Sequence, residues 1–471
     1  MKSRLAMAAA LLGAASILGT SPAYGATTPR TQCAAEANYP AASTPVAFWS
    51  TEARCAIVPA GLGGTFGAEN FWNKFPGEAA VYMGIVHLAM YDAAVALEGR
   101  YRPYVPTPAA PANTSPEAAI ATAAYDTLTG LQPQLGADQT ILDDDYTAYM
   151  AAIPDGTAVE HAAKQHGIAV GEQVARAVLA LRANDGRERN PTLADLDPPA
   201  PGPGVWQPAP GTVLGLRLPG IKPLALSSAS QLRPNGPNPM TSRAYAEDFN
   251  QVKELGRLDS TARTPEQTRQ ARFWTDHDLR QWNDGMLRLA AARGLDLVQT
   301  ARMLAMAHVA GGDGMIACFD AKYHYWSWRP YQAIPLADTD GNRKTVPDPS
   351  WTPLATTPNF PEYPSAHACH STAVVKALDA FFGTDKVPFM LDSRVTHTTR
   401  EYKRLHNIVK DVDLARVLVG FHFLSSDLQG SRLGGKVGRY VARHYFQRSG
   451  SADQSSTAAS SSASTGAPRP S

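Results

Sequence analysis

The chain has 471 residues, of which 44% are hydrophobic and 18% charged; this balance excludes disordered, collagen-like and coiled-coil proteins. The 43 Lys and Arg residues and the 42 Asp and Glu residues give a formal net charge of +1. A nearly neutral chain has no overall electrostatic attraction to nucleic acid, so we expect no nucleic-acid partner. The length is ample for a large hydrophobic core.

Residues 1–25 have the pattern of a secretory signal peptide. Lys2 and Arg4 begin it, an apolar stretch covers residues 5–18, and Ala23 and Gly25 are small residues at the positions that a signal peptidase reads. The apolar stretch is too short to span a bilayer comfortably. We therefore expect removal of this segment and a secreted, extracellular chain without a membrane span.

The cysteine content fits an exported protein. The four cysteines are Cys33, Cys55, Cys318 and Cys369. An even number outside the cytosol suggests two disulfides, for which three pairings are possible. We favour Cys33–Cys55 and Cys318–Cys369. A zinc site is the alternative, but the spacings contain no paired CxxC motif, which disfavours it.

The first half of the chain is predicted to be helical after a mixed, turn-rich stretch over residues 26–70. Apolar residues near a 3.6-residue period predict helices over residues 78–97, 116–131 and 159–183. Residues 184–242 then contain prolines and glycines at a density that no helix tolerates. A long ordered loop of this kind is usually a lid or a pocket wall, and otherwise a linker.

The second half begins with a helix start signal. Thr264 is expected as an N-cap, Pro265 as the first helical residue and Gln267 as the reciprocal capping residue. The apolar pattern predicts a second helix over residues 296–328, with a break at the Gly-Gly pair 311–312.

A second proline-rich loop covers residues 335–364, and helices are predicted to follow over residues 365–382 and 411–446. Residues 449–471 are mostly Ser, Ala, Thr and Gly, which predicts a disordered tail. Runs of alternating β-branched residues are scarce. We therefore predict a mostly α protein with two long functional loops, folded as one unit over residues 26–448.

Three short motifs carry the candidate chemistry, and the first contains two cations. Lys322 and Arg329 are seven residues apart, which on a helix places them on one face, with Pro330 ending the helix. Two like charges on one face repel each other unless an anion lies between them. The alternative is an ordinary solvated face, where Lys and Arg usually lie.

The second motif is Pro364-Ser365-Ala366-His367, at the start of the predicted helix 365–382. Ser365 and the free backbone N–H groups would meet the positive end of the helix dipole, which makes an anion site. His367 in the same turn can supply a proton. The alternative is that Ser365 is simply an N-cap.

The third motif contains Arg416 and His422, which lie about 120° apart if the helix is continuous. A long arginine side chain can reach round this angle, although a histidine in an apolar stretch is often a satisfied core residue. Taken together, the two arginines, the lysine, Ser365 and the two histidines form a cage for a tetrahedral oxyanion. The cations neutralise its charge, one histidine attacks or ligates the central atom, and the other moves a proton.

The joint pattern resembles the signature of the vanadium haloperoxidase and type 2 acid phosphatase superfamily: Lys–six residues–Arg-Pro, then Pro-Ser-Gly-His, then Arg–five residues–His. The similarity to the vanadium haloperoxidase branch covers about residues 75–445. Its further matching segments are residues 87–92, 100–103, 201–206, 271–274, 328–330 and 360–363. The resemblance implies two four-helix bundles in one compact unit, with the cage in the half formed by about residues 264–446.

The resemblance also implies a role for each cage residue. His422 would bond the vanadium of vanadate, and His367 would be the acid–base residue. The groups that would hold the vanadate oxygens are Lys322, Arg329, Ser365, Arg416 and the amide of Ala366. Lys322 would also polarise a bound peroxide. The substrates would be hydrogen peroxide and a halide, with a small organic acceptor, and Phe360 stands where chloroperoxidase-type members carry phenylalanine.

The chain departs from the family pattern at three positions. Ala366 replaces the usual glycine, which keeps the N–H but adds a methyl group, and Ala415 replaces a frequent serine. Asp427 follows His422 by five residues, whereas the phosphatase pattern has an aspartate at four. The residue that orients His422 is therefore left open.

Two further functions remain. In a secreted phosphatase, phosphate would occupy the same cage, His422 would attack phosphorus and His367 would protonate the leaving group. A non-catalytic oxyanion-binding protein is disfavoured because both histidines are present. The proline-rich loops and Trp328 favour the haloperoxidase. Among the other histidines, we expect His308 in the core, whereas His324 and His370 match no motif role. A supporting role for His370 beside His367 is the less favoured alternative.

Overall fold

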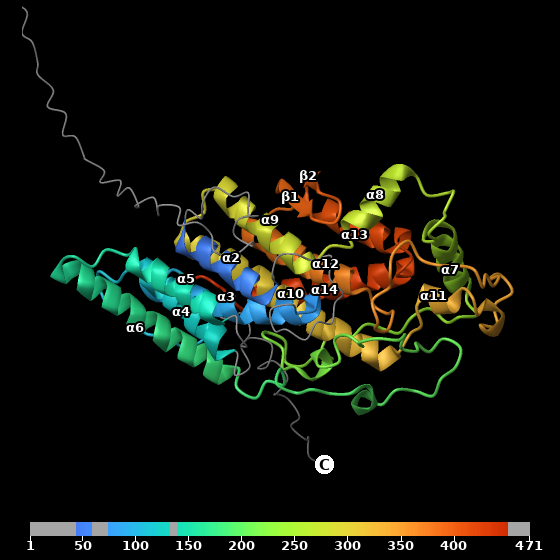
Figure 1. The fold of residues 1–471 in the computed structure, drawn as a ribbon, viewed down its shortest axis with the longest axis horizontal. Helices are drawn as coiled ribbons and strands as arrows, with labels where there is room; N and C mark the ends of the chain where they lie inside the picture. Colours follow the sequence, from blue (N-terminus) through green and yellow to red (C-terminus); the bar gives the residue numbers. More distant parts are fainter. Residues whose placement is uncertain (1–43, 59–73, 132–138, 451–471) are drawn as a thin grey trace, which may run out of the picture.

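The computed structural model describes residues 44–58, 74–131 and 139–450 (Figure 1). The predicted signal peptide, Cys33 and nearly all of the predicted tail lie outside these residues. Within them the chain is mostly helical and has one two-stranded sheet. The mostly α fold predicted from the sequence is confirmed.

The first bundle contains four helices, with a fifth helix against one of them. The four are α2 (Pro45–Ile57), α3 (Pro76–Glu98), α4 (Pro116–Gly130) and α6 (Ala158–Leu181), and the fifth is α5 (Gln139–Ala151). Helices α3, α4 and α6 contact one another, α2 contacts α3 and α4, and α5 packs against α4. A capping box of Thr157 and Glu160 begins α6. Helices α4 and α6 approach closely, because a Cβ at Gly171 would lie only 2.7 Å from the carbonyl oxygen of Ala119.

The second bundle carries the three motifs. Its helices are α10 (Leu297–Tyr325), α12 (Ala366–Phe382), α13 (Leu405–Leu418) and α14 (Leu424–His444). Glycines line the contact between α12 and α14: a Cβ at Gly430 would lie 2.6 Å from the carbonyl oxygen of Ser365. A Cβ at Gly438 would lie 2.5 Å from that of Ala373. The two helices therefore pack backbone against backbone.

Helix α3 joins the bundles by packing along α10 (Figure 1). It is apolar and long enough to cross a membrane by length and composition, but 94% of its most apolar window is buried inside the protein. Its neighbours in both bundles cover it on all sides, so it serves as the central core helix.

Smaller elements surround the second bundle. They are α7 (Arg243–Leu255), α8 (Pro265–Phe273), α9 (Asp278–Ala292), α11 (Pro330–Ala333), β1 (Phe389–Ser393) and β2 (Thr398–Tyr402). The two strands form an antiparallel hairpin in which Leu391 pairs with Arg400. The predicted start of α8 is confirmed, because Thr264 and Gln267 form a capping box around Pro265.

The long loop over residues 184–242 is fixed to the second bundle. The buried carboxylate of Asp313 on α10 accepts hydrogen bonds from the backbone N–H groups of Leu224, Ala225 and Leu226 at 2.5, 2.8 and 2.7 Å. Further along, the N–H of Trp206 donates to the carbonyl of Trp326 at 2.6 Å. The loop is therefore a wall beside the motif-bearing helices and not a linker.

Three helix boundaries differ from the prediction. Helix α10 is unbroken at 311–312, where the absence of side chains admits His370: a Cβ at Gly311 would lie 2.7 Å from its Nε2. The helix ends at Tyr325 because Trp326 has a left-handed backbone, with φ of 52°. The single helix predicted over 411–446 is two helices, separated at residues 419–423.

The predicted Cys318–Cys369 disulfide is wrong for this structure. Both side chains are fully buried free thiols, with their Sγ atoms 2.7 Å apart between α10 and α12. The predicted Cys33–Cys55 pair involves a residue outside the described ranges and stays a prediction. Within those ranges no group of three or more His, Cys, Asp or Glu side chains has metal-binding geometry, which gives the zinc alternative no support.

The state of the two thiols predicts a labelling result. Native protein should not be alkylated at Cys318 and Cys369, because both are inaccessible, and unfolding without reductant should expose both to iodoacetamide. Intact-mass comparison with a double variant, Cys318→Ser and Cys369→Ser, isolates their contribution as two added alkyl groups. Equal labelling of the unfolded protein and the double variant would show that the thiols had formed a disulfide.

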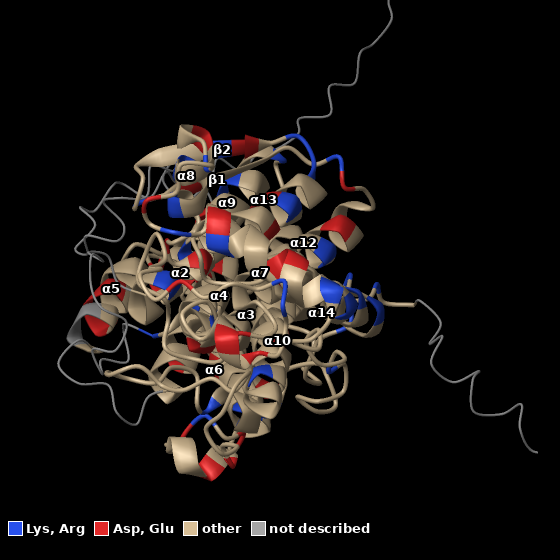
Figure 2. Ribbon diagram, turned by 90° about the vertical axis from the view of Figure 1, so that its right-hand side faces the viewer, with Lys and Arg blue, Asp and Glu red and all other residues tan. Residues whose placement is uncertain are grey.

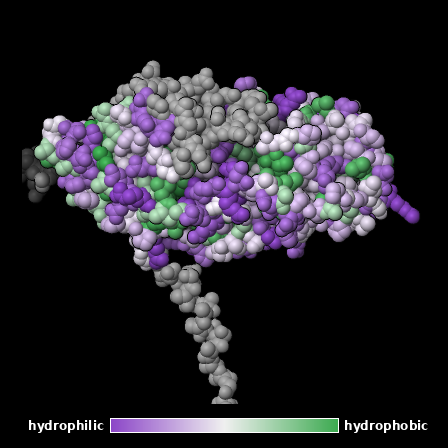
Figure 3. Space-filling view, turned by 60° about the horizontal axis from the view of Figure 1, so that its bottom comes forward, coloured by the Kyte–Doolittle hydropathy of each residue, from purple (hydrophilic) through white to green (hydrophobic). Residues whose placement is uncertain are grey.

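The surface shows no dominant charge. Figure 2 shows Lys and Arg interspersed with Asp and Glu over the helices in view, as expected for a nearly neutral chain. Figure 3 shows hydrophobic residues on one face as separate small patches between hydrophilic ones. Single exposed apolar side chains are ordinary for a globular protein.

Candidate oxyanion site

The three predicted motifs meet at one buried place in the second bundle. Lys322 lies in the last turn of α10, Arg329 is the residue before α11, Ser365 precedes α12, and Arg416 lies in the last turn of α13. His422 lies in the turn between α13 and α14. All five side chains are at most 2% exposed. Burial of three cations together requires a compensating anion or carboxylates.

The Lys322 ammonium group binds the loop before α12. Its Nζ donates to the carbonyl oxygens of Pro361 and Glu362 at 3.1 and 2.9 Å, and to that of Pro364. It also lies 4.9 Å from the centre of the Phe360 ring. Burial lowers the pKa of Lys322 to about 8. The three carbonyl oxygens use all three hydrogens of the ammonium group. Lys322 can therefore donate to an oxyanion only if it gives up its hydrogen bond to one of these carbonyls.

Each arginine is held along part of its guanidinium group and has a buried nitrogen without a hydrogen-bond partner. Arg329 donates to the carbonyls of Phe360 and Phe421, both at 3.0 Å, and Arg416 donates to that of Trp274 at 2.6 Å. Arg329 Nη2 and Arg416 Nε have no hydrogen-bond partner within the described ranges. Burial lowers the pKa of both arginines to about 10, so both are cationic at neutral pH.

Ser365 and His367 add two more polar atoms of this kind. Ser365 occupies the N-cap position of α12, but its hydroxyl does not cap the helix. Its Oγ and the Nε2 of His367 are buried without a hydrogen-bond partner among the residues described. Burial, reinforced by the neighbouring Arg416, lowers the pKa of His367 to about 3, so the imidazole is neutral.

The four atoms without partners test whether the site suits an oxyanion. They are Arg329 Nη2, Ser365 Oγ, His367 Nε2 and Arg416 Nε. Buried polar groups in proteins are nearly always hydrogen-bonded, so four such atoms from three segments indicate an absent acceptor. Two guanidinium groups and a hydroxyl at a helix start match the charge and hydrogen-bonding needs of a tetrahedral oxyanion. The residues present therefore fit vanadate or phosphate.

A turn, and not a helical face, brings His422 back to Arg416. Helix α13 ends at Leu418, and the N–H groups of Phe421 and His422 both donate to the carbonyl of Arg416, at 3.1 and 3.3 Å. Gly420 has φ of 82°, a conformation that favours glycine. The predicted separation of about 120° assumed a continuous helix and is wrong for that reason.

The carboxylate of Glu362 is a site residue that the motifs did not predict. Its Oε1 lies 2.8 Å from Nδ1 of His422 and accepts the N–H of Phe423 at 3.1 Å. The signal was its place in the segment 360–363, directly before the second motif. Asp427 is buried as well, but neither of its oxygens has a hydrogen-bond partner in the described structure. Its opposite-charge neighbour is Arg416.

Asp278 was also missed, and it supports the other histidine. It is fully buried at the start of α9, with Oδ2 3.1 Å from Nδ1 of His370. Burial raises the pKa of Asp278, but the adjacent His370 and His367 outweigh it and lower that pKa below its usual range. Asp278 thus connects His370 with His367, which the sequence offered only as the less favoured alternative. His308 is in the core, where it stacks on His87 with ring centres 4.2 Å apart.

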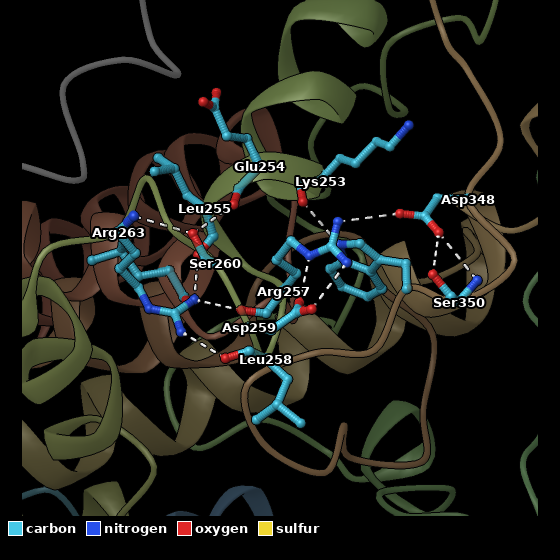
Figure 4. Close-up of polar contacts among 12 residues, drawn as sticks. Lys253, Glu254, Leu255, Arg257, Leu258, Asp259, Ser260, Arg263, Asp348 and Ser350 are labelled. Atoms are coloured by element: carbon cyan, nitrogen blue, oxygen red, sulfur yellow. Dashed lines mark hydrogen bonds and ion pairs between the residues drawn. The ribbon is translucent and has the colours of Figure 1, made fainter.

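The guanidinium group of Arg263 holds the connection between α7 and α8 together by donating to the carbonyl of Arg257 at 2.8 Å (Figure 4). It also donates to the carbonyl of Leu418 at 3.3 Å and so supports the end of α13. A surface hollow of about 560 Å³ lies beside this connection. Its Arg257 is paired with Asp259 and Asp348, so the hollow has no unpaired arginine to attract an anion.

Comparison with known proteins defines the class. Residues 302–450 match the model of the family described as the VCPO second helical-bundle domain. A bacterial vanadium-dependent iodoperoxidase superimposes with a TM-score of 0.65 and 23% identity, covering 79% of this chain and 92% of that one. None of the curated proteins matches.

Two structures of a bacterial vanadium-dependent chloroperoxidase are similar too. The apo form has a TM-score of 0.61 and 18% identity, covering 77% of this chain and 91% of its own. The holo form has a TM-score of 0.59 and 17% identity, covering 78% and 92%. The described chain thus has the fold of the vanadium-dependent haloperoxidases. Residues 302–450 match the family model of the VCPO second helical-bundle domain, in agreement with the resemblance drawn from the motifs.

Proposed function

We propose that the protein is a secreted vanadate-dependent haloperoxidase, which oxidises a halide with hydrogen peroxide to a hypohalous acid equivalent. The observation that carries the proposal is the set of four buried polar atoms without partners, gathered between three cations and two histidines. The vanadium haloperoxidase fold supports it. Phosphate is expected to compete for the same cage because its charge and shape are similar.

The cage residues divide the work of holding an oxyanion. The free N–H groups of Arg329 and Arg416, the Ser365 hydroxyl and the Ala366 amide would hold its oxygens. His422 would be the ligand of the metal, and vanadate, when bound, supplies the activation of peroxide. Lys322 would join by releasing one of its three carbonyl acceptors.

Proton transfer falls to His367. Its imidazole is neutral, and its Nε2 has no hydrogen-bond partner among the described residues, so it can accept a proton at the cage. Asp278 stabilises the positive charge that His367 then carries, and His370 pairs with Asp278 at 3.1 Å. The centre of the Phe360 ring lies 4.6 Å from the guanidinium carbon of Arg329, so this side of the site has an aromatic surface. Because Phe360 stands where chloroperoxidase-type members carry phenylalanine, we propose chloride as a substrate.

A secreted phosphatase is the second candidate, because the His422–Glu362 contact suits its mechanism as well. A carboxylate that orients an imidazole is the usual support of a nucleophilic histidine. His422 would attack phosphorus, and His367 would protonate the leaving alcohol.

One assay separates these functions. The mature protein, stripped of bound anion, is tested for peroxide-dependent halogenation of a phenolic dye with bromide and with chloride, with and without orthovanadate. Turnover that needs vanadate supports the haloperoxidase, and use of chloride supports the role of Phe360. If no halogenation occurs and the protein hydrolyses a phosphate monoester in a reaction that vanadate inhibits, the result supports the phosphatase instead. N-terminal sequencing of the exported protein should begin at Ala26.

The His367→Ala variant should keep oxyanion binding and lose turnover by a factor of ~10² or more, because the proton-transfer group is gone while the cations remain. Equilibrium dialysis of orthovanadate and the halogenation assay measure the two effects separately. Loss of binding with the activity would show that His367 holds the anion and does not transfer protons.

A further inference from the structure

We propose that Glu362 is the residue that positions His422, by fixing the imidazole tautomer whose Nε2 is free of hydrogen. The inference rests on the proposed function only for its kinetic consequence. The question is open because the aspartate of the phosphatase pattern is displaced by one residue, to Asp427.

The Nδ1 side of the ring selects this tautomer. Glu362 Oε1 lies 2.8 Å from Nδ1 of His422, and it also accepts the N–H of Phe423 at 3.1 Å. An ionised carboxylate can only accept, and the oxygen that accepts the backbone N–H presents its second lone pair to the ring. Opposite the Glu362 carboxylate, Nδ1 therefore carries the hydrogen.

The opposite side of the ring selects the same tautomer. Nε2 of His422 lies 2.9 Å from Nη1 of Arg329, and a guanidinium nitrogen can only donate. A hydrogen on Nε2 would place two donors against each other in a site where both side chains are at most 2% exposed. The Glu362 carboxylate on one side and the Arg329 guanidinium on the other thus favour one tautomer of His422. In this tautomer the lone pair of Nε2 points toward the cage.

Glu362 is itself held by the cage. Its N–H donates to the carbonyl of Ser327 at 2.8 Å, and its carbonyl accepts from Lys322 at 2.9 Å. Arg329 Nε donates a hydrogen bond to the same loop, at the carbonyl oxygen of Phe360, with a distance of 3.0 Å. The two cations that frame the site therefore also fix the position of the carboxylate that orients His422. This is the preorganisation that a ligand histidine needs from its partner.

Asp427 does not fill this role. No hydrogen bond joins its carboxylate to His422 among the described residues, and the groups that act on its charge include Asp413, Ser365 and Arg416. The structure thus separates two acidic functions: Glu362 serves His422, while Asp427 balances Arg416.

The test compares Glu362→Ala and Glu362→Gln with the wild type in anion-free protein labelled with ¹⁵N at histidine. The His422 signals, assigned by their loss in His422→Ala, should show hydrogen on Nδ1 and a free Nε2 in the wild type. Glu362→Gln keeps an oxygen that accepts from Nδ1 and should keep this pattern. Glu362→Ala should lose it and bind orthovanadate ~10- to 100-fold more weakly by equilibrium dialysis.

Asp427→Asn is the matched acidic control, and its His422 pattern should equal that of the wild type. Hydrogen on Nε2 of wild-type His422 would overturn the proposal even if Glu362→Ala fails to fold. A Glu362→Ala variant with the wild-type pattern and affinity would overturn it as well. If the wild type binds no vanadate, the proposed function fails, whereas the tautomer measurement still decides the role of Glu362.

Discussion

The His422→Ala variant should lose peroxide-dependent halide oxidation by a factor of ~10⁴ or more, because the substitution removes the group that bonds the central atom in either proposed reaction. Arg329 Nη1 loses its neighbour at 2.9 Å, and Glu362 loses the imidazole at 2.8 Å. The remaining cations still attract an anion, so weakened binding of orthovanadate should remain measurable by equilibrium dialysis.

The control for this variant is His324→Ala. His324 belongs to the first motif by sequence, but its side chain is exposed and contacts the ring of Tyr325 instead of the cage. Its activity should equal that of the wild type. Full activity in His422→Ala, by contrast, would exclude both proposed mechanisms, because each requires a bond between His422 and the central atom.

The Asp313→Ala variant should lower the free energy of unfolding by about 3–5 kcal/mol. The carboxylate accepts three backbone N–H groups of the long loop, at 2.5, 2.8 and 2.7 Å, and is fully buried. Each buried N–H left without an acceptor costs about 1–3 kcal/mol, and local movement of the loop recovers part of the sum. Urea unfolding followed by circular dichroism measures the change.

Two variants make this result specific. Asp338→Ala removes an exposed carboxylate and should change the free energy of unfolding by less than about 0.5 kcal/mol. Asp313→Asn keeps one acceptor oxygen and should fall between the wild type and Asp313→Ala. An alanine variant as stable as the wild type would show that the loop does not depend on Asp313 for its attachment.

Local signals in the sequence were enough for the mostly α fold. Thr264 with Gln267 marks a helix start by direct hydrogen bonding to neighbouring backbone, so sequence alone locates it. The spacing of the three motifs was enough to select five residues that the structure brings together: Lys322, Arg329, Ser365, Arg416 and His422. Their proposed roles still await the experiments above.

Features that depend on contacts between distant segments could not be predicted. Glu362 and His422 are 60 residues apart, and no periodicity relates them. The turn at Gly420 interrupts an apolar pattern that looks continuous, since a Cβ there would lie 2.6 Å from the carbonyl oxygen of Gly256. Likewise, the glycines at 311–312 looked like a helix break, but they admit His370 and the backbone of α3.

The glycine contact between α12 and α14 has a consequence for ion size. The carbonyl of Ser365, which begins α12, rests against Gly430, where even a methyl group would lie 2.6 Å away. Gly430 therefore fixes the position of the Ser365 hydroxyl and the Ala366 amide in the proposed site, although it does not itself line that site. A larger residue at position 430 should then shift these two groups and change the preference between a smaller and a larger tetrahedral ion, while the side chains proposed to hold the ion stay the same.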